Sequence, residues 1–154
     1  MSRLVAVLAG LGVSAGIAVA DDERARVNYM LHCQGCHLAD AAGFPDRVPR
    51  MKDFVGYFMH SRDGREFLIR VPGVATSSLP DDELTELMNW LLETYSAGEL
   101  PDDYEPFSID EVASLRARLE PDPEAARTRI LEDIASARPA LARAIVTTIH
   151  NNDK

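Results

Sequence analysis

The sequence predicts an all-α protein, and three observations support this prediction. Residues 80–96 place apolar side chains at helical spacing on one face, namely Leu84, Leu87, Met88, Leu91 and Tyr95. Ser108 and Glu111 have the spacing of a capping box, which opens a further helix. No stretch of more than a few residues alternates apolar and polar side chains as a half-buried strand does.

The N-terminal segment, residues 1–20, is typical of a cleavable secretory signal. It has one basic residue, Arg3, then the apolar run Leu4–Val13, and its small C-terminal residues predict cleavage after Ala20. The apolar run is too short and too rich in Gly and Ala to predict a membrane span. We therefore expect an exported, periplasmic protein that has no membrane span after cleavage.

Removal of this segment leaves 15 basic and 25 acidic side chains, a formal net charge of −10. Nucleic-acid binding is not expected, because phosphate recognition requires concentrated positive charge. The charge favours a partner protein with a basic docking surface, because the acidic field would accelerate their encounter. Maintenance of solubility explains the same charge equally well.

Residues 21–96 form the first predicted unit of the mature chain. In order, the sequence predicts a helix at 22–33, a loop at 38–50, short helical pieces at 51–60 and 64–70, a loop at 71–78 and the helix at 80–96. The apolar face of the first helix would consist of Val27, Met30 and Leu31. Asp63–Gly64 is expected to interrupt the two short pieces.

Residues 97–154 predict a helical C-terminal extension. Gly98 and Pro101 end the preceding helix, and prolines separate three further helices, at 108–119, 124–137 and 140–150. The expected organisation is therefore a signal over 1–20, a domain over 21–96 and the extension over 97–154. The extension is expected either to pack against the domain or to serve as a docking element.

Both cysteines lie in the stretch LHCQGCHLAD, where His37 directly follows Cys33-x-x-Cys36. A disulfide or a redox dithiol leaves His37 unexplained, and a thioredoxin-like motif also needs a βαβ context that is missing. A structural zinc site usually needs four Cys or His ligands, and no second paired cluster is present. Cys-x-x-Cys-His is the signature of covalent haem c attachment. We therefore predict one haem c, with Cys33 and Cys36 as thioether anchors and His37 as the proximal iron ligand.

At this point the chain resembles the class I c-type cytochromes, over about residues 24–95. The resemblance rests on RVNYMLHCQGCH, on GFPDRVP with Pro49, on DGREFL and on LPDDELTELMNWLLETYS. It implies a cytochrome c-like helical domain around one haem, in which the Pro49 carbonyl orients His37 and an aromatic residue, Trp90 or Tyr95, lies near the haem; a core position would equally explain Trp90. It also implies an electron carrier between a dehydrogenase and a terminal acceptor, or the haem subunit of a larger oxidoreductase, rather than an enzyme in itself.

The sequence departs from this family on the distal side of the haem. The usual methionine ligand would fall at about Val71, and no Met, His or Lys occurs between Ile69 and Leu87. Met59 and His60 are the candidate distal ligands, with a core position for Met59 and a surface position for His60 as the alternatives. Met51 and Met88 are expected in the core. An open sixth position is a further alternative, and it would make the protein a gas-binding or sensing haem protein.

Overall fold

The computed structural model describes residues 16–45 and 47–152, and this part of the chain is helical. The elements are α1 Gly16–His32, α2 Gln34–His37, the 3-10 helix η1 Val55–His60, α3 Arg62–Arg70, α4 Pro72–Ala75, α5 Asp81–Tyr95, the 3-10 helix η2 Ala97–Glu99, α6 Ile109–Arg116, α7 Pro123–Ala137 and α8 Pro139–Asn152. The only β-type pairing among these residues is an isolated bridge between Phe44 and Val48. The predicted all-α class is confirmed.

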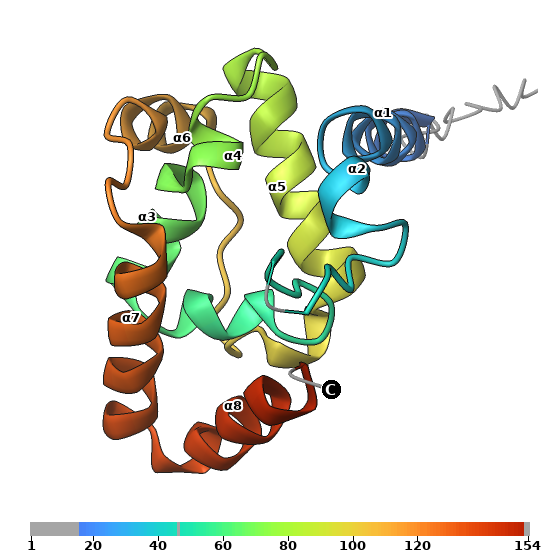
Figure 1. The fold of residues 1–154 in the computed structure, drawn as a ribbon. Helices are drawn as coiled ribbons and strands as arrows, with labels where there is room; N and C mark the ends of the chain where they lie inside the picture. The colour runs from blue at the N-terminus through green and yellow to red at the C-terminus, as the bar shows by residue number, and fades with distance from the viewer. Residues whose placement is uncertain (1–15, 46, 153–154) are drawn as a thin grey trace, which may run out of the picture.

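Helices α1 and α5 pack against each other, but α1 does not use the predicted face (Figure 1). Val27 and Met30 are about half exposed and Leu31 is 72% exposed, whereas Ala25, Asn28 and Tyr29 are the buried residues among those of α1 whose side chains are described, 22–32. The prediction that Val27, Met30 and Leu31 form the packed face of α1 was therefore wrong. On α5 the predicted residues Leu84, Leu87, Met88 and Leu91 are buried, and Leu92 joins them.

The segment between α2 and α5 differs from the prediction at two places. The break between η1 and α3 lies at Ser61, because the Ser61 side chain accepts a 3.0 Å hydrogen bond from the Gly64 N–H and caps α3. The predicted loop over 71–78 contains the short helix α4, which begins with Pro72 at a position where its missing N–H costs nothing. Residues 38–50 form the predicted loop.

The C-terminal extension wraps around one side of the rest of the molecule (Figure 1). Helix α6 contacts α3, α4 and α5, α7 continues along α3 and η1, and α8 packs on α7. The caps of α6 and α7 are Ser108 and Asp122, which accept hydrogen bonds from Glu111 and Ala125. The buried residues of the extension belong to the same hydrophobic core as those of 21–96, and they are Phe107, Val112, Leu115, Ala126, Ile130, Leu131, Ile134 and Ile145.

The predicted signal segment falls mostly outside the described residues. Residues 16–20 form the start of α1, and the helix is continuous through Ala20. Cleavage after Ala20 stays a prediction. Among the residues that the structure describes, no helix combines the length and apolar character that a bilayer span requires.

Candidate functional site

Cys33, Cys36 and His37 come together at the corner between α1 and α2. The Cys33 carbonyl accepts hydrogen bonds from the backbone N–H groups of Cys36 and His37, at 3.1 and 2.9 Å, so the three residues share one helical turn. Both thiols are free, Cys33 partly buried against the core and Cys36 exposed. Burial, assisted by the neighbouring Cys36, raises the pKa of the Cys33 thiol to about 11.

The imidazole of His37 is half-buried, and burial lowers its pKa from the ordinary value. The Pro49 backbone carbonyl acts on this ring in the opposite direction and raises the pKa by a smaller amount. His37 Nδ1 is buried, and within the described residues it has no hydrogen bond of normal geometry. The structure therefore places Pro49 next to His37, and burial favours the neutral form of this imidazole, the form that binds a metal ion.

The loop after His37 is held by a backbone hydrogen bond, the conformation of Gly43 and the hydroxyl of Tyr29. The Gly43 N–H donates to the His37 carbonyl at 3.1 Å, and Gly43 has a positive φ of 71°. A Cβ atom at position 43 would lie 2.9 Å from the Pro49 oxygen. Glycine is therefore required where this part of the loop approaches Pro49. The hydroxyl of Tyr29 donates to the carbonyl of Leu38 at 2.7 Å.

Trp90, the predicted haem neighbour, is partly buried in an aromatic cluster beside this corner. Its ring centroid lies 5.8 Å from that of Tyr29 and 5.5 Å from that of Tyr95. The Tyr29 and Tyr95 rings lie 5.3 Å apart. Sequence reasoning missed Tyr29, although its position four residues before Cys33 puts both on one face of α1. The cluster joins α1 to α5 close to the cysteine motif.

The two candidate distal ligands lie next to each other at the end of η1. Met59 is buried in the main core, 9% exposed. The Nε2 atom of His60 lies 2.9 Å from the Glu99 carbonyl, which only accepts hydrogen bonds, so Nε2 carries the proton and donates. Ligation of an iron by Nε2 would require this bond to break. The two ligand assignments stay predictions.

The segment where a methionine was expected lies on the other side of α5 from the cysteine motif. Figure 1 shows α2 and α4 on either side of α5. Val71 and Val74 are partly buried and pack against the core. Met88 is buried in the same core, as expected, whereas Met51 is only partly buried and packs against it. The side chains of 71–79 provide no nitrogen or sulfur ligand.

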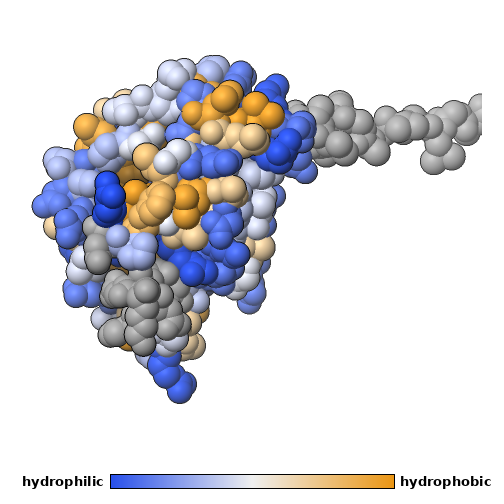
Figure 2. Space-filling view, turned by 45° about the vertical axis from the view of Figure 1, so that its right-hand side comes forward, coloured by the Kyte–Doolittle hydropathy of each residue, from blue (hydrophilic) through white to orange (hydrophobic). Residues whose placement is uncertain are grey.

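Apolar side chains gather on the side of the molecule that carries α1, which Figure 2 turns towards the viewer. In the described part of the chain, the large apolar residues that are exposed between 27 and 44 are Val27, Met30, Leu31 and Phe44. They come from α1 and from the loop after α2, the two elements that flank the cysteine motif. An exposed apolar surface of this kind is typical of a place where a ligand or a partner binds.

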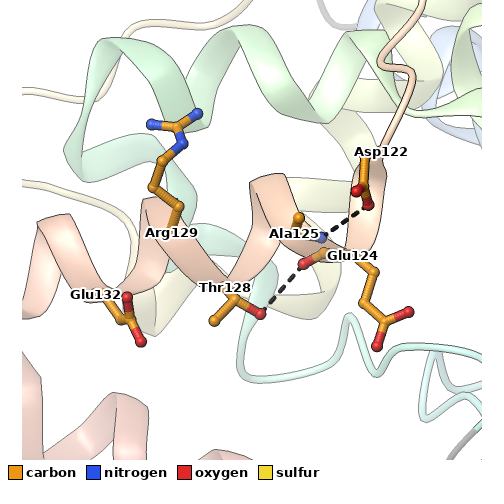
Figure 3. Close-up of a pocket in the computed structure, with 6 residues that line it drawn as sticks. All are labelled: Asp122, Glu124, Ala125, Thr128, Arg129 and Glu132. Carbon is orange, nitrogen blue, oxygen red and sulfur yellow. Dashed lines mark hydrogen bonds between the residues drawn. The ribbon is translucent and has the colours of Figure 1, made fainter.

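A surface depression on α7 is a different kind of feature (Figure 3). Asp122 and Thr128 in it make hydrogen bonds within the helix, to the Ala125 N–H at 3.1 Å and to the Glu124 carbonyl at 3.2 Å. Arg129 Nη1 forms an ion pair with Asp133 Oδ2 at 3.5 Å. These contacts cap and solubilise α7, so the depression has no role in the candidate site.

Comparisons with known proteins identify no similar protein. No family model matches the chain, and no curated protein or solved structure is significantly similar to it.

Proposed function

We propose that this protein is a periplasmic c-type cytochrome with one haem, which carries single electrons between a dehydrogenase and a terminal acceptor. Cys33 and Cys36 bind the haem covalently, and His37 is the proximal ligand of its iron. The observation that carries this proposal is the presence of two free thiols and a half-buried imidazole on one turn at the α1–α2 corner. A bound haem would supply the one-electron chemistry.

The thiols of Cys33 and Cys36 provide the covalent attachment. Each S–H would add across one vinyl group, so that one C–S and one C–H bond form and no oxidant is consumed. The reaction needs reduced cysteines, and both thiols are free in the structure. The raised pKa of Cys33 keeps this thiol mostly protonated at neutral pH.

His37 and Pro49 provide the proximal side. A metal ligand must be deprotonated, and burial of His37 favours its neutral form at pH 7. Its buried Nδ1 needs an acceptor, and the Pro49 carbonyl already acts on the ring. We expect Nδ1–H to donate to this carbonyl in the loaded protein, which fixes the tautomer and leaves Nε2 for the iron.

The surface around the motif fits a redox partner. Val27, Met30, Leu31 and Phe44 are exposed near the cysteine motif, and contact with the haem edge or with a docked protein would remove them from water. The net charge of the mature chain is strongly negative, which favours a partner with a basic docking surface. Such a charge would act mainly on the rate of encounter.

A second candidate function is reversible binding of a gas at an open sixth position of the iron. Three observations favour it: the segment 71–79 offers no ligand, Met59 is buried in the core, and His60 is hydrogen-bonded to Glu99. An iron with an open position binds small ligands, whereas one with two tight axial ligands mainly relays electrons. This candidate shares the haem attachment of the first and differs only on the distal side.

Production in a host that has the periplasmic haem-attachment machinery tests the proposal. We expect haem to remain bound after denaturation in the wild type, and the Cys33→Ala/Cys36→Ala double variant to lose it. Covalent haem in the double variant, or none in the wild type, would contradict the proposal. Exposure of the reduced protein to carbon monoxide then separates the candidates, because an unchanged spectrum indicates the carrier and rapid adduct formation indicates the gas-binding protein.

A further inference from the structure

Arg116, in the last turn of α6, is bound to four acceptors from the segment that joins α4 to α5. Its Nε donates to the Ala75 carbonyl at 3.3 Å. Its Nη1 donates to the Leu79 carbonyl at 2.9 Å and to Asp81 Oδ1 at 2.8 Å. Its Nη2 donates to the Ser77 carbonyl. One guanidinium from the C-terminal extension therefore fixes the backbone at three places within five residues.

The Arg116 guanidinium is largely shielded from water, which strengthens its hydrogen bonds. The Arg116 side chain is only 16% exposed, so water competes weakly for the three carbonyls. The last carbonyls of a short helix such as α4 have no partner within the helix and must find one elsewhere. The planar guanidinium has five N–H donors in a fixed arrangement, which suits it to bind several carbonyls together. A lysine would hold fewer of them.

A second set of contacts ties the beginning of the same segment to the residues after α6. The Nε of Arg70 donates to the Arg118 carbonyl at 2.8 Å, and the Glu120 N–H donates to the Arg70 carbonyl at 2.9 Å. The side chains of Arg70 and Glu120 also form an ion pair at 3.1 Å. Both ends of residues 71–80 are thus held by residues 116–120.

We infer that Arg116 is a positioning residue, through which the C-terminal extension holds residues 71–80 in place opposite the haem-binding motif. The side chains of this segment offer no Met, His or Lys, so a bond to iron cannot hold it. Arg116 provides that restraint from within the protein. The part of the inference that concerns the haem rests on the proposed function.

The inference has a consequence for ligand access to the iron. Val71 and Val74 lie in the restrained segment and pack against the core. Release of Ala75, Ser77 and Leu79 from Arg116 would leave the hydrogen bonds at Arg70 and the packing of the apolar side chains to hold the segment, so that it would move more freely. Small ligands would then reach the iron at a different rate, while the thioethers at Cys33 and Cys36 would be unaffected.

The test compares Arg116→Gln and Arg116→Lys with Arg118→Ala. The control side chain lies two residues after the end of the same helix, is 55% exposed and makes a long contact with Glu66 at 3.4 Å. Amide hydrogen exchange is measured over residues 73–80 and, as an internal reference, over α5. In Arg116→Gln we expect exchange in the segment to be about tenfold faster, with α5 unchanged. Arg116→Lys should recover part of the protection, and Arg118→Ala should match the wild type.

The haem-loaded variants provide the second readout, the rate at which the reduced protein binds carbon monoxide. We expect Arg116→Gln to change this rate by about threefold or more and to keep its haem covalently bound. Unchanged exchange in 73–80, or equal acceleration in α5, would overturn the positioning role. Changed exchange with an unchanged carbon monoxide rate, or a wild type that binds no carbon monoxide, would overturn its effect on ligand access to the iron. If the wild type holds no covalent haem, the proposed function fails, and the exchange data still decide whether Arg116 restrains the segment.

Discussion

The hydroxyl of Tyr29 donates a 2.7 Å hydrogen bond to the carbonyl of Leu38, the residue directly after His37. Tyr29 is 1% exposed and lies on the face of α1 that packs on α5. Leu38 has a positive φ of 64°, which an L-residue adopts only when its surroundings require it. The hydroxyl therefore ties the packing of the two helices to the backbone that follows the cysteine motif.

Tyr29→Phe tests this link. It leaves the Leu38 carbonyl without its donor in a partly buried place, and we expect the free energy of unfolding to fall by about 1 to 2 kcal/mol, measured by urea denaturation. Tyr95→Phe is the matched control, because the Tyr95 hydroxyl donates to the Ala39 carbonyl at 2.9 Å in an exposed place. The control should lose about 0.5 kcal/mol or less. Equal losses in the two variants would contradict the role given to Tyr29.

Gly43→Ala tests the loop that brings Pro49 to His37. An alanine Cβ would clash with the Val48 oxygen, at a backbone φ of 71° that already disfavours a side chain. We expect a loss of about 2 to 3 kcal/mol in unfolding free energy and less haem retained per molecule. Gly98→Ala is the control, because a Cβ there would meet no atom within 4 Å. Wild-type stability and haem content in Gly43→Ala would show that the close approach is not needed.

The Arg65–Glu111 pair predicts a pH dependence of stability. The Arg65 guanidinium binds both oxygens of Glu111, at 2.6 and 2.8 Å, and this hydrogen bonding holds the pKa of that carboxyl below its ordinary 4.5. A carboxyl with a lowered folded-state pKa stabilises the fold fully above its unfolded-state pKa, and the contribution disappears as the pH falls through the folded-state value.

Glu111→Gln isolates this contribution. At pH 7 we expect the variant to be less stable than the wild type by about 1 kcal/mol, a value reduced for the partial exposure of the pair. The difference should be constant down to about pH 4.5 and should shrink below it, as followed by denaturant unfolding at a series of pH values. A difference that stays constant into the acid range would mean that the variant acts through packing rather than through charge.

His60→Gln and Met59→Leu test the distal ligand. A glutamine amide can still donate to the Glu99 carbonyl, and leucine keeps the apolar volume of a core methionine. The open-site candidate, in which His60 Nε2 stays engaged by Glu99 and Met59 stays buried, predicts an unchanged visible spectrum of the reduced haem protein in each variant. A shift from a six-coordinate to a five-coordinate spectrum in one of them would identify that residue as the ligand.

The elements of the fold that local patterns encode were predicted from the sequence. The apolar stripe of α5 and the capping residue Ser108 follow from spacing within one or two turns, and both are present in the structure. The face of α1 was not predicted, because Val27, Met30 and Leu31 are apolar while the packed face includes the polar Asn28. Asn28 donates a 2.9 Å hydrogen bond to Glu83, and this contact cannot be predicted from a local sequence pattern.

The same distinction holds for the candidate site. Cys33, Cys36 and His37 are adjacent in the sequence, so their motif could be read directly. Arg116 acts on residues 35 to 41 positions earlier in the chain, and its partners are mostly backbone carbonyls that any residue would provide. Contacts of this kind depend on how α6 packs against α4 and α5, which spacing alone does not determine.

The intact mass of the protein, purified from the periplasm of a host that attaches haem and measured under denaturing conditions, tests the central claim most directly. We predict the mass of the polypeptide from Asp21 to Lys154 plus one haem, and loss of that added mass in the Cys33→Ala/Cys36→Ala variant. The mass of the polypeptide alone, or of a polypeptide that has lost two hydrogens to a Cys33–Cys36 disulfide, would contradict the assignment of this protein as a c-type cytochrome.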